Sequence, residues 1–149
     1  MDQVYKSRMV FGALAAKAAE RVVRLLQPKD AERVGALLRR ARPRAKGLPS
    51  PETAKATSKA LLEIRESVTC ETASWWALTS AIYSTSLCFA DYRWGDDSVE
   101  CRWTAHRAIH AASVAEFIEA EHRRIEDETL LFSLKLELDQ LREAAKKDC

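Results

Sequence analysis

The chain is 149 residues long with a formal net charge of +2, a size that fits one domain able to bury roughly two-thirds of its unfolded surface. Charge divides it in two, because residues 1–49 hold twelve Lys or Arg against four Asp or Glu, whereas residues 50–149 hold twelve against eighteen. The four glycines stand apart from one another, which excludes a Walker loop and a dinucleotide-binding fingerprint.

The first 51 residues, which contain all four prolines, are expected to hold two helices and a linker. Residues 3–26 predict a helix ended by Pro28, since apolar residues recur every three or four positions: Phe11, Leu14, Ala18, Val22 and Leu25. A shorter helix should run from an N-cap at Asp30 to about Arg40. Residues 41–50 are expected to form an exposed linker, because two prolines and a glycine interrupt any helix.

The middle of the chain predicts a third helix and a central one. Ser50, Pro51 and Glu52 have the order of an N-cap, a first-turn proline and a first-turn acid. After a break near Cys70, residues 72–90 carry no charge, and as a helix they would be roughly 28 Å long, close to the thickness of a bilayer core. Seven hydroxyl side chains among these nineteen residues argue against a span exposed to lipid. We therefore expect a soluble, single-domain, all-α bundle of about five or six helices around this segment.

The C-terminal half predicts helix throughout. Gly95 is expected to stop the central helix, and Asp97 or Ser98 to cap the next, whose stripe is Val99, Trp103, Val114, Phe117 and Ile125. Residues 130–138 alternate as a strand would, but no other segment could pair with them. A helical stripe predicts helix instead: Leu131, Leu134, Leu138, Leu141 and Ala145. Phe132 and Leu136 then lie on the opposite side, where either the fold covers them or they form an apolar patch for a partner.

All three histidines fall on the predicted helix 99–126. His106 and His110 are four residues apart, the spacing at which two imidazoles on one helix face can bind a metal. They share the angle of Trp103 and Phe117, so both are expected to be at least partly buried. One alternative function is a metal-dependent helical enzyme that uses this pair. The competing interpretation is a pair of structural histidines that bond to a carboxylate or carbonyl, and no cofactor is then expected.

A basic segment without acidic residues lies where the second helix meets the linker: Arg39, Arg40, Arg42, Arg44 and Lys46. It could neutralise several phosphates, which makes nucleic-acid binding a second alternative. It lacks interleaved aromatic residues for base stacking, and a solvated linker has the same composition. The basic first block as a whole indicates either an anionic partner or a face that complements the acidic second block within the fold.

The spacing of the cysteines and the N-terminal residues indicate the cellular compartment of the protein. Cys70, Cys88, Cys101 and Cys149 include no Cys-x-x-Cys pair, and the chain does not begin with the basic and apolar layout of a signal peptide. Free thiols in the reducing cytoplasm are the expectation.

Aromatic residues gather between Trp75 and Trp103, which include all four tryptophans. Trp75 and Trp103 are expected in the core. A turn combining aromatic, basic and acidic side chains is the candidate surface for a partner protein, together with Phe132 and Leu136. This turn consists of Tyr92, Arg93, Trp94, Asp96 and Asp97.

The order of segments resembles small alanine-rich helical bacterial proteins, some of which are called immunity proteins against polymorphic toxins. The resemblance rests on residues 15–22, on Trp75-Trp76-Ala77, and on residues 108–112 with the charged stretch 119–128. It implies a non-enzymatic, protein-binding bundle whose partner is a toxin domain, and it transfers no functional residue. The near-neutral net charge departs from the acidic balance expected of an inhibitor of a basic nuclease. The absence of a Gly-x-Ser-x-Gly motif also favours binding over catalysis.

Overall fold

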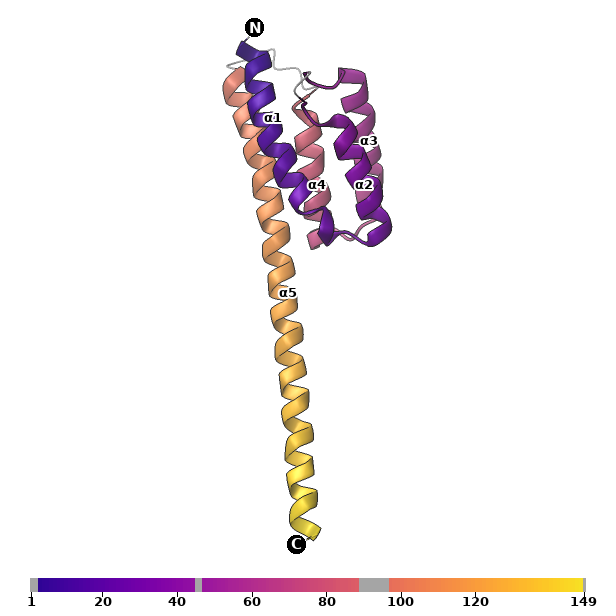
Figure 1. Cartoon of the computed structure of the whole chain (residues 1–149), viewed down its shortest axis with the longest axis vertical. Coiled ribbons are helices and arrows are strands. Elements are labelled where there is room, and N and C mark those ends of the chain that lie inside the picture. The colour runs from indigo at the N-terminus through magenta and orange to yellow at the C-terminus, as the bar shows by residue number, and fades with distance from the viewer. Residues whose placement is uncertain (1–2, 45–46, 89–96, 149) are drawn as a thin grey trace. The chain divides into compact units, whose positions relative to one another are not determined.

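The computed structural model describes residues 3–44, 47–88 and 97–148. Within these ranges there are five α-helices, one short 3-10 helix and no β-strand (Figure 1): α1 (Gln3–Arg21), η1 (Val23–Leu25), α2 (Pro28–Ala41), α3 (Pro51–Glu66), α4 (Ala73–Ser86) and α5 (Asp97–Asp148). The predicted all-α fold is confirmed. The chain divides into two compact units, unit 1 (Met1–Glu116) and unit 2 (Phe117–Cys149), so the single domain predicted for residues 1–149 stays a prediction.

Local sequence signals explain most helix boundaries in unit 1. Ser50 caps α3 as predicted, because its hydroxyl accepts a hydrogen bond from the backbone N–H of Thr53 at 3.1 Å. The predicted N-cap at Asp30 is wrong, since α2 begins at Pro28, whose fixed φ suits the first helical position, and Asp30 lies in the first turn. The predicted break near Cys70 is confirmed, and Glu71 turns the chain there with a left-handed φ of 63°.

The linker between α2 and α3 packs more closely against α1 than its composition predicts. Arg44 and Gly47 exchange two backbone hydrogen bonds at 3.0 and 2.9 Å. A Cβ atom added to Gly12 would lie 2.9 Å from Cγ of Pro43, so the close approach of linker and helix requires glycine at this position. The linker is therefore a partly buried connection rather than a fully exposed one.

Helix α4 is the buried centre of unit 1, as its lack of charge predicts. It contacts α1, η1, α2 and α3, and half of its fourteen residues are buried. Its hydroxyls find partners: Thr79 donates to the carbonyl of Trp75 at 2.9 Å, and Ser80 donates to the carbonyl of Ala108 in α5 at 2.7 Å. Across the described ranges, no helix combines the length and the apolar character that crossing a bilayer requires.

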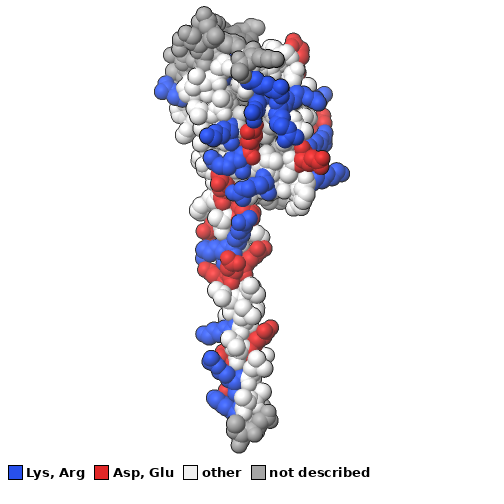
Figure 2. All heavy atoms as spheres, in the orientation of Figure 1, with Lys and Arg blue, Asp and Glu red and all other residues white. Residues whose placement is uncertain are grey.

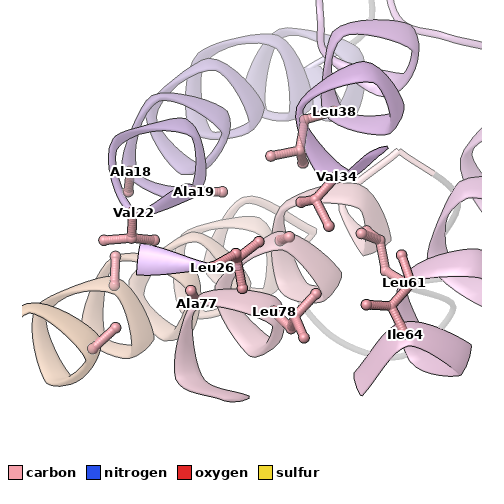
Figure 3. Close-up of a cluster of buried hydrophobic side chains, with 13 residues drawn as sticks. Ala18, Ala19, Val22, Leu26, Val34, Leu38, Leu61, Ile64, Ala77 and Leu78 are labelled. Atoms are coloured by element: carbon pink, nitrogen blue, oxygen red, sulfur yellow. The ribbon is translucent and has the colours of Figure 1, made fainter. Parts of the chain in front are cut away.

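The main core of unit 1 is formed by side chains from four helices around α4 (Figure 3). Leu38 of α2, Leu61 of α3 and Leu78 of α4 are almost completely buried. Val22 and Leu26, which flank η1, close the same cluster. Burying a leucine side chain completely stabilises a fold by roughly 2 to 3 kcal/mol, so these few positions account for much of the stability of unit 1.

The part of α5 in unit 1 packs through alanines and not through its large side chains. The buried residues are Cys101, Ala105, Ala108, Ala111, Ala112 and Ala115, whereas Trp103 is 56% exposed. The stripe predicted through Val99, Trp103, Val114, Phe117 and Ile125 is therefore wrong at three positions, since Phe117 and Ile125 are exposed like Trp103. Val114 is half-buried, and the side chain of Val99 lies outside the described set. Small residues let α5 approach the alanine-rich face of α1 closely, an arrangement that a search for large apolar residues misses.

Candidate interaction surface

Unit 2 is a single helical segment whose side chains are open to solvent. Every side chain from 122 to 146 is exposed. Phe117, Leu131, Phe132 and Leu141 are each more than 60% exposed, and five further large apolar residues in this unit are at least 46% exposed. Exposed apolar side chains at such density are typical of an interaction surface.

Charged residues in the first half of unit 2 favour helix without any packing. Arg123 pairs with Glu119 at 3.0 Å, and Arg124 pairs with Glu121 at 3.1 Å and with Glu128 at 2.7 Å. These partners lie three or four residues apart, a spacing at which exposed pairs stabilise a helix weakly. The hydrogen bond that Arg124 donates to Glu121, followed by the charges of Glu121 and Glu128, raises the pKa of Arg124 above its ordinary value.

Most apolar residues of unit 2 lie on two faces, and all members of these faces are exposed except Ile118, which is half-buried. The first, here called the acidic-flanked face, consists of Ile118, Ile125, Phe132 and Leu136. The second, here called the leucine face, consists of Leu131, Leu134, Leu138, Leu141 and Ala145. At 100° per residue the centres of the two faces lie roughly 180° apart around the helix.

Glutamates occupy the positions on both sides of the acidic-flanked face. Glu119 and Glu126 follow Ile118 and Ile125, and Glu121 and Glu128 border the face on its other edge. Residues 117–128 hold five carboxylates against two arginines. Beyond them, residues 129–134 carry no charge, and Figure 2 shows a white band between two charged stretches of this helix.

The predicted residues Phe132 and Leu136 share a face with Ile125, which the sequence analysis placed in a core stripe, and with Ile118, which it did not single out. Phe132 is 64% exposed and Leu136 is exposed as well, so the fold within the described chain does not cover them. Ile118 and Ile125 lie on the same face. The seven-residue spacing from Ile118 to Ile125 to Phe132 was the signal that could have found them.

The predicted turn at Tyr92, Arg93, Trp94 and Asp96 lies outside the described residues, as does the predicted helix stop at Gly95. Helix α5 begins at Asp97, whose side chain is also outside the described set. The partner-binding role of this turn stays a prediction.

The histidine pair is placed on the surface of unit 1. His106 and His110 are both exposed, which corrects the expected partial burial, because α5 turns its alanines inward. Their rings stack at a centroid distance of 6.4 Å, and Trp103 meets His106 edge-on at 6.1 Å. No third metal ligand joins them among the residues that the structure describes. Their possible use as a metal site stays a prediction.

The basic segment has partners for two of its arginines. Arg42 donates to Glu20 of α1 at 3.0 Å, and Arg44 donates to the backbone carbonyl of Arg39 at 2.9 Å. Arg40, Arg42 and Arg44 line one shallow surface pocket with the linker, and Lys and Arg cover much of the face of unit 1 seen in Figure 2. Lys46 lies outside the described residues. Nucleic-acid binding at this segment stays a prediction.

Three cysteines, none of them in a disulfide, lie in contrasting surroundings. Cys70 is exposed, whereas Cys88 and Cys101 are buried. Burial raises the pKa of Cys88 from its ordinary value of 9.0 to about 11, and the charge of Arg8 opposes this rise. The thiolate that nucleophilic catalysis needs is therefore disfavoured at Cys88.

The described surface thus has one extended apolar feature, the exposed helix of unit 2. A bound protein can cover apolar side chains along several helical turns, whereas a small molecule covers few of them. Comparisons with family models, with curated proteins and with solved structures found no match to this chain.

Proposed function

We propose that the protein acts without catalysis, by binding another protein through the acidic-flanked face of unit 2. The observation that carries the proposal is the exposure of Ile125, Phe132 and Leu136 on one side of a helix bordered by glutamates. The fuller form of the proposal is a bacterial immunity protein that neutralises a toxin domain in the cytoplasm.

Burial of this face supplies the affinity. Removing apolar surface from water contributes about 25 cal/mol per Å², and aromatic side chains such as Phe132 dominate many interfaces. Ile118, Ile125 and Phe132 are seven residues apart, so a helix or groove of the partner can contact all three at once.

The glutamates determine the chemistry of the partner. Glu119, Glu121, Glu126 and Glu128 border the apolar side chains, so the matching surface is an apolar groove or helix with basic residues at its rim. Their pairs with Arg123 and Arg124 are exposed and weak, and a partner's basic residues can therefore compete for them. A basic toxin domain has the charge that this surface complements.

The test is capture from the native host with the full chain, using a double variant with Phe132→Glu and Leu136→Glu. Each captured protein is identified by mass spectrometry, purified and bound again to the wild-type chain. We expect the double variant to raise the Kd by about 100-fold or more, because two apolar contacts are lost and two charges meet an apolar surface.

Ser133→Glu is the matched control, since Ser133 is exposed and belongs to neither face. It adds one negative charge, half of what the double variant adds, to the same turn and should leave the Kd unchanged within threefold. Capture of no protein at low salt, or equal binding by the double variant and the wild-type chain, contradicts the proposal.

A further inference from the structure

The leucine face has the spacing of a coiled-coil seam. With the seven positions of each heptad lettered a to g, Leu131, Leu138 and Ala145 occupy a, and Leu134 and Leu141 occupy d. Apolar residues at a and d, spaced alternately by three and four, are the pattern by which helices wind around one another. All five residues are exposed in the chain described here.

We propose that a second copy of this chain covers the leucine face, as a parallel coiled coil with the two helices in register. The inference rests on the proposed function in taking unit 2 as a binding element, but it uses the opposite face of the helix. Both faces can thus be occupied at once.

The charges beside the seam match an identical chain in register. In a parallel pair, each g residue meets the e residue of the next heptad on the partner helix. Glu137 at g then meets Arg142 at e of the other copy, and the symmetry of the pair repeats this contact on both sides of the seam. Among the described residues, Glu137 and Arg142 have no ion-pair partner within their own chain, so both are available for this contact.

The antiparallel arrangement is disfavoured by the same residues. The antiparallel alignment that buries all four leucines pairs Leu131 with Leu141 and Leu134 with Leu138. It brings Lys135 opposite Lys135 of the other copy, and Glu137 opposite Glu137. It offers Arg142 only Glu128 of the other copy, which is already paired with Arg124 of its own chain at 2.7 Å. Like charges across a seam oppose association, which leaves the parallel arrangement.

The acidic-flanked face does not pair with itself in the same way. A parallel pair through Ile118, Ile125 and Phe132 would place Glu121 beside Glu126 of the other copy. The antiparallel alternative would place Glu128 beside Glu128. Self-association through this face is therefore opposed by charge, and the second copy is assigned to the leucine face.

The test is sedimentation equilibrium of the purified full chain in reducing buffer. We expect the mass of two 16.8 kDa chains at micromolar concentration. Leu134→Glu should raise the dimer Kd by roughly 100-fold or more, since it places two charges in the seam. Far-UV circular dichroism of each variant checks that unit 1 remains folded.

Charge exchange tests the parallel register without disturbing the seam. Glu137→Arg alone should raise the dimer Kd by about tenfold, because it makes both contacts with Arg142 repulsive. The double variant Glu137→Arg with Arg142→Glu should restore the wild-type Kd. In an antiparallel dimer Glu137→Arg changes the Kd little, and adding Arg142→Glu does not restore the wild-type Kd. This pair of results overturns the proposal.

Failure of this inference differs from failure of the proposed function. The inference is overturned if the chain has the mass of a single copy at every concentration. The proposed function remains in place if the Phe132→Glu and Leu136→Glu variant still abolishes capture of another protein. A dimer that is sensitive to Leu134→Glu but captures no other protein supports the inference and contradicts the proposed function.

Discussion

Ala108 shows how strongly the packing of α5 in unit 1 depends on small side chains. It is fully buried in a cluster with Ala15, Leu87, Cys101 and Ala105, and its carbonyl accepts the hydrogen bond of Ser80 at 2.7 Å. Replacing it with leucine adds three carbons at a point where α5 has no spare volume. The helix must move away, or neighbouring side chains must leave their preferred rotamers.

The expected cost of Ala108→Leu combines two effects. Overpacking a well-packed core costs about 1 to 3 kcal/mol. A shift of α5 also breaks or lengthens the buried hydrogen bond from Ser80, which contributes about 1 kcal/mol. We therefore expect unit 1 to lose about 2 to 4 kcal/mol of unfolding free energy, a large share of the 5 to 15 kcal/mol typical of a domain.

Urea unfolding followed by tryptophan fluorescence measures this loss, because Trp75 and Trp76 lie in α4 of unit 1. Ala120→Leu is the matched control, since it makes the same change on an exposed residue of the same helix. It should change the free energy by less than about 0.5 kcal/mol. An unchanged unfolding midpoint for Ala108→Leu, or an equal loss for both variants, would refute the alanine packing of α5.

Three further predictions concern the thiols and the histidines. Cys70 should react with a thiol reagent within minutes while Cys88 and Cys101 stay protected in the folded chain, and equal labelling rates would contradict their burial. The pKa of Cys88 in the folded chain lies above its ordinary value, so the unfolded chain loses the thiol proton at a lower pH than the folded chain does. The unfolding free energy should therefore fall as the pH rises from 9 to about 11, by up to about 2 to 3 kcal/mol. A Cys88→Ala chain should lack this part of the pH dependence. If the unfolding free energy of both chains falls equally with pH, the raised pKa of Cys88 is contradicted. His106→Ala and His110→Ala should each change the unfolding free energy by less than about 0.5 kcal/mol, because both side chains are exposed. Elemental analysis of untagged protein should find no stoichiometric metal, and bound metal that is lost with His110→Ala would support the metal-site alternative instead.

The central position of α4 could be predicted because it depends on what the segment lacks. No charge occurs between Glu71 and Asp91, and a helix without charge must be surrounded by other helices or by lipid. The hydroxyls decided between these two, and in the structure Thr79 and Ser80 do bond to carbonyls as that argument requires.

The packing of α5 could not be predicted from the same kind of signal. Periodicity gives weight to large apolar residues, and Trp103 and Phe117 defined a stripe that turned out to be exposed. The buried face consists of alanines, which hydropathy patterns barely distinguish from surface alanines. Complementary small residues on α1 and α5 become visible only once the two helices are placed side by side in unit 1.

The candidate interaction surface was predicted in part. The alternating pattern over residues 130–138 placed Phe132 and Leu136 on the side of the helix opposite the leucine face. Either the fold or a partner could then cover these two residues. What the sequence left open was whether the fold itself covers either side. That question depends on tertiary contacts, and the exposure of every side chain from 122 to 146 answers it for the described chain.

Hydrogen exchange of the full chain, measured with and without the protein that it captures, tests the central claim most directly. The account predicts slower exchange on binding in the amides of residues 118–136, and no change in residues 39–44 or 102–110. Slowing confined to the basic segment or to the histidine-bearing part of α5, with residues 118–136 unaffected, would contradict it.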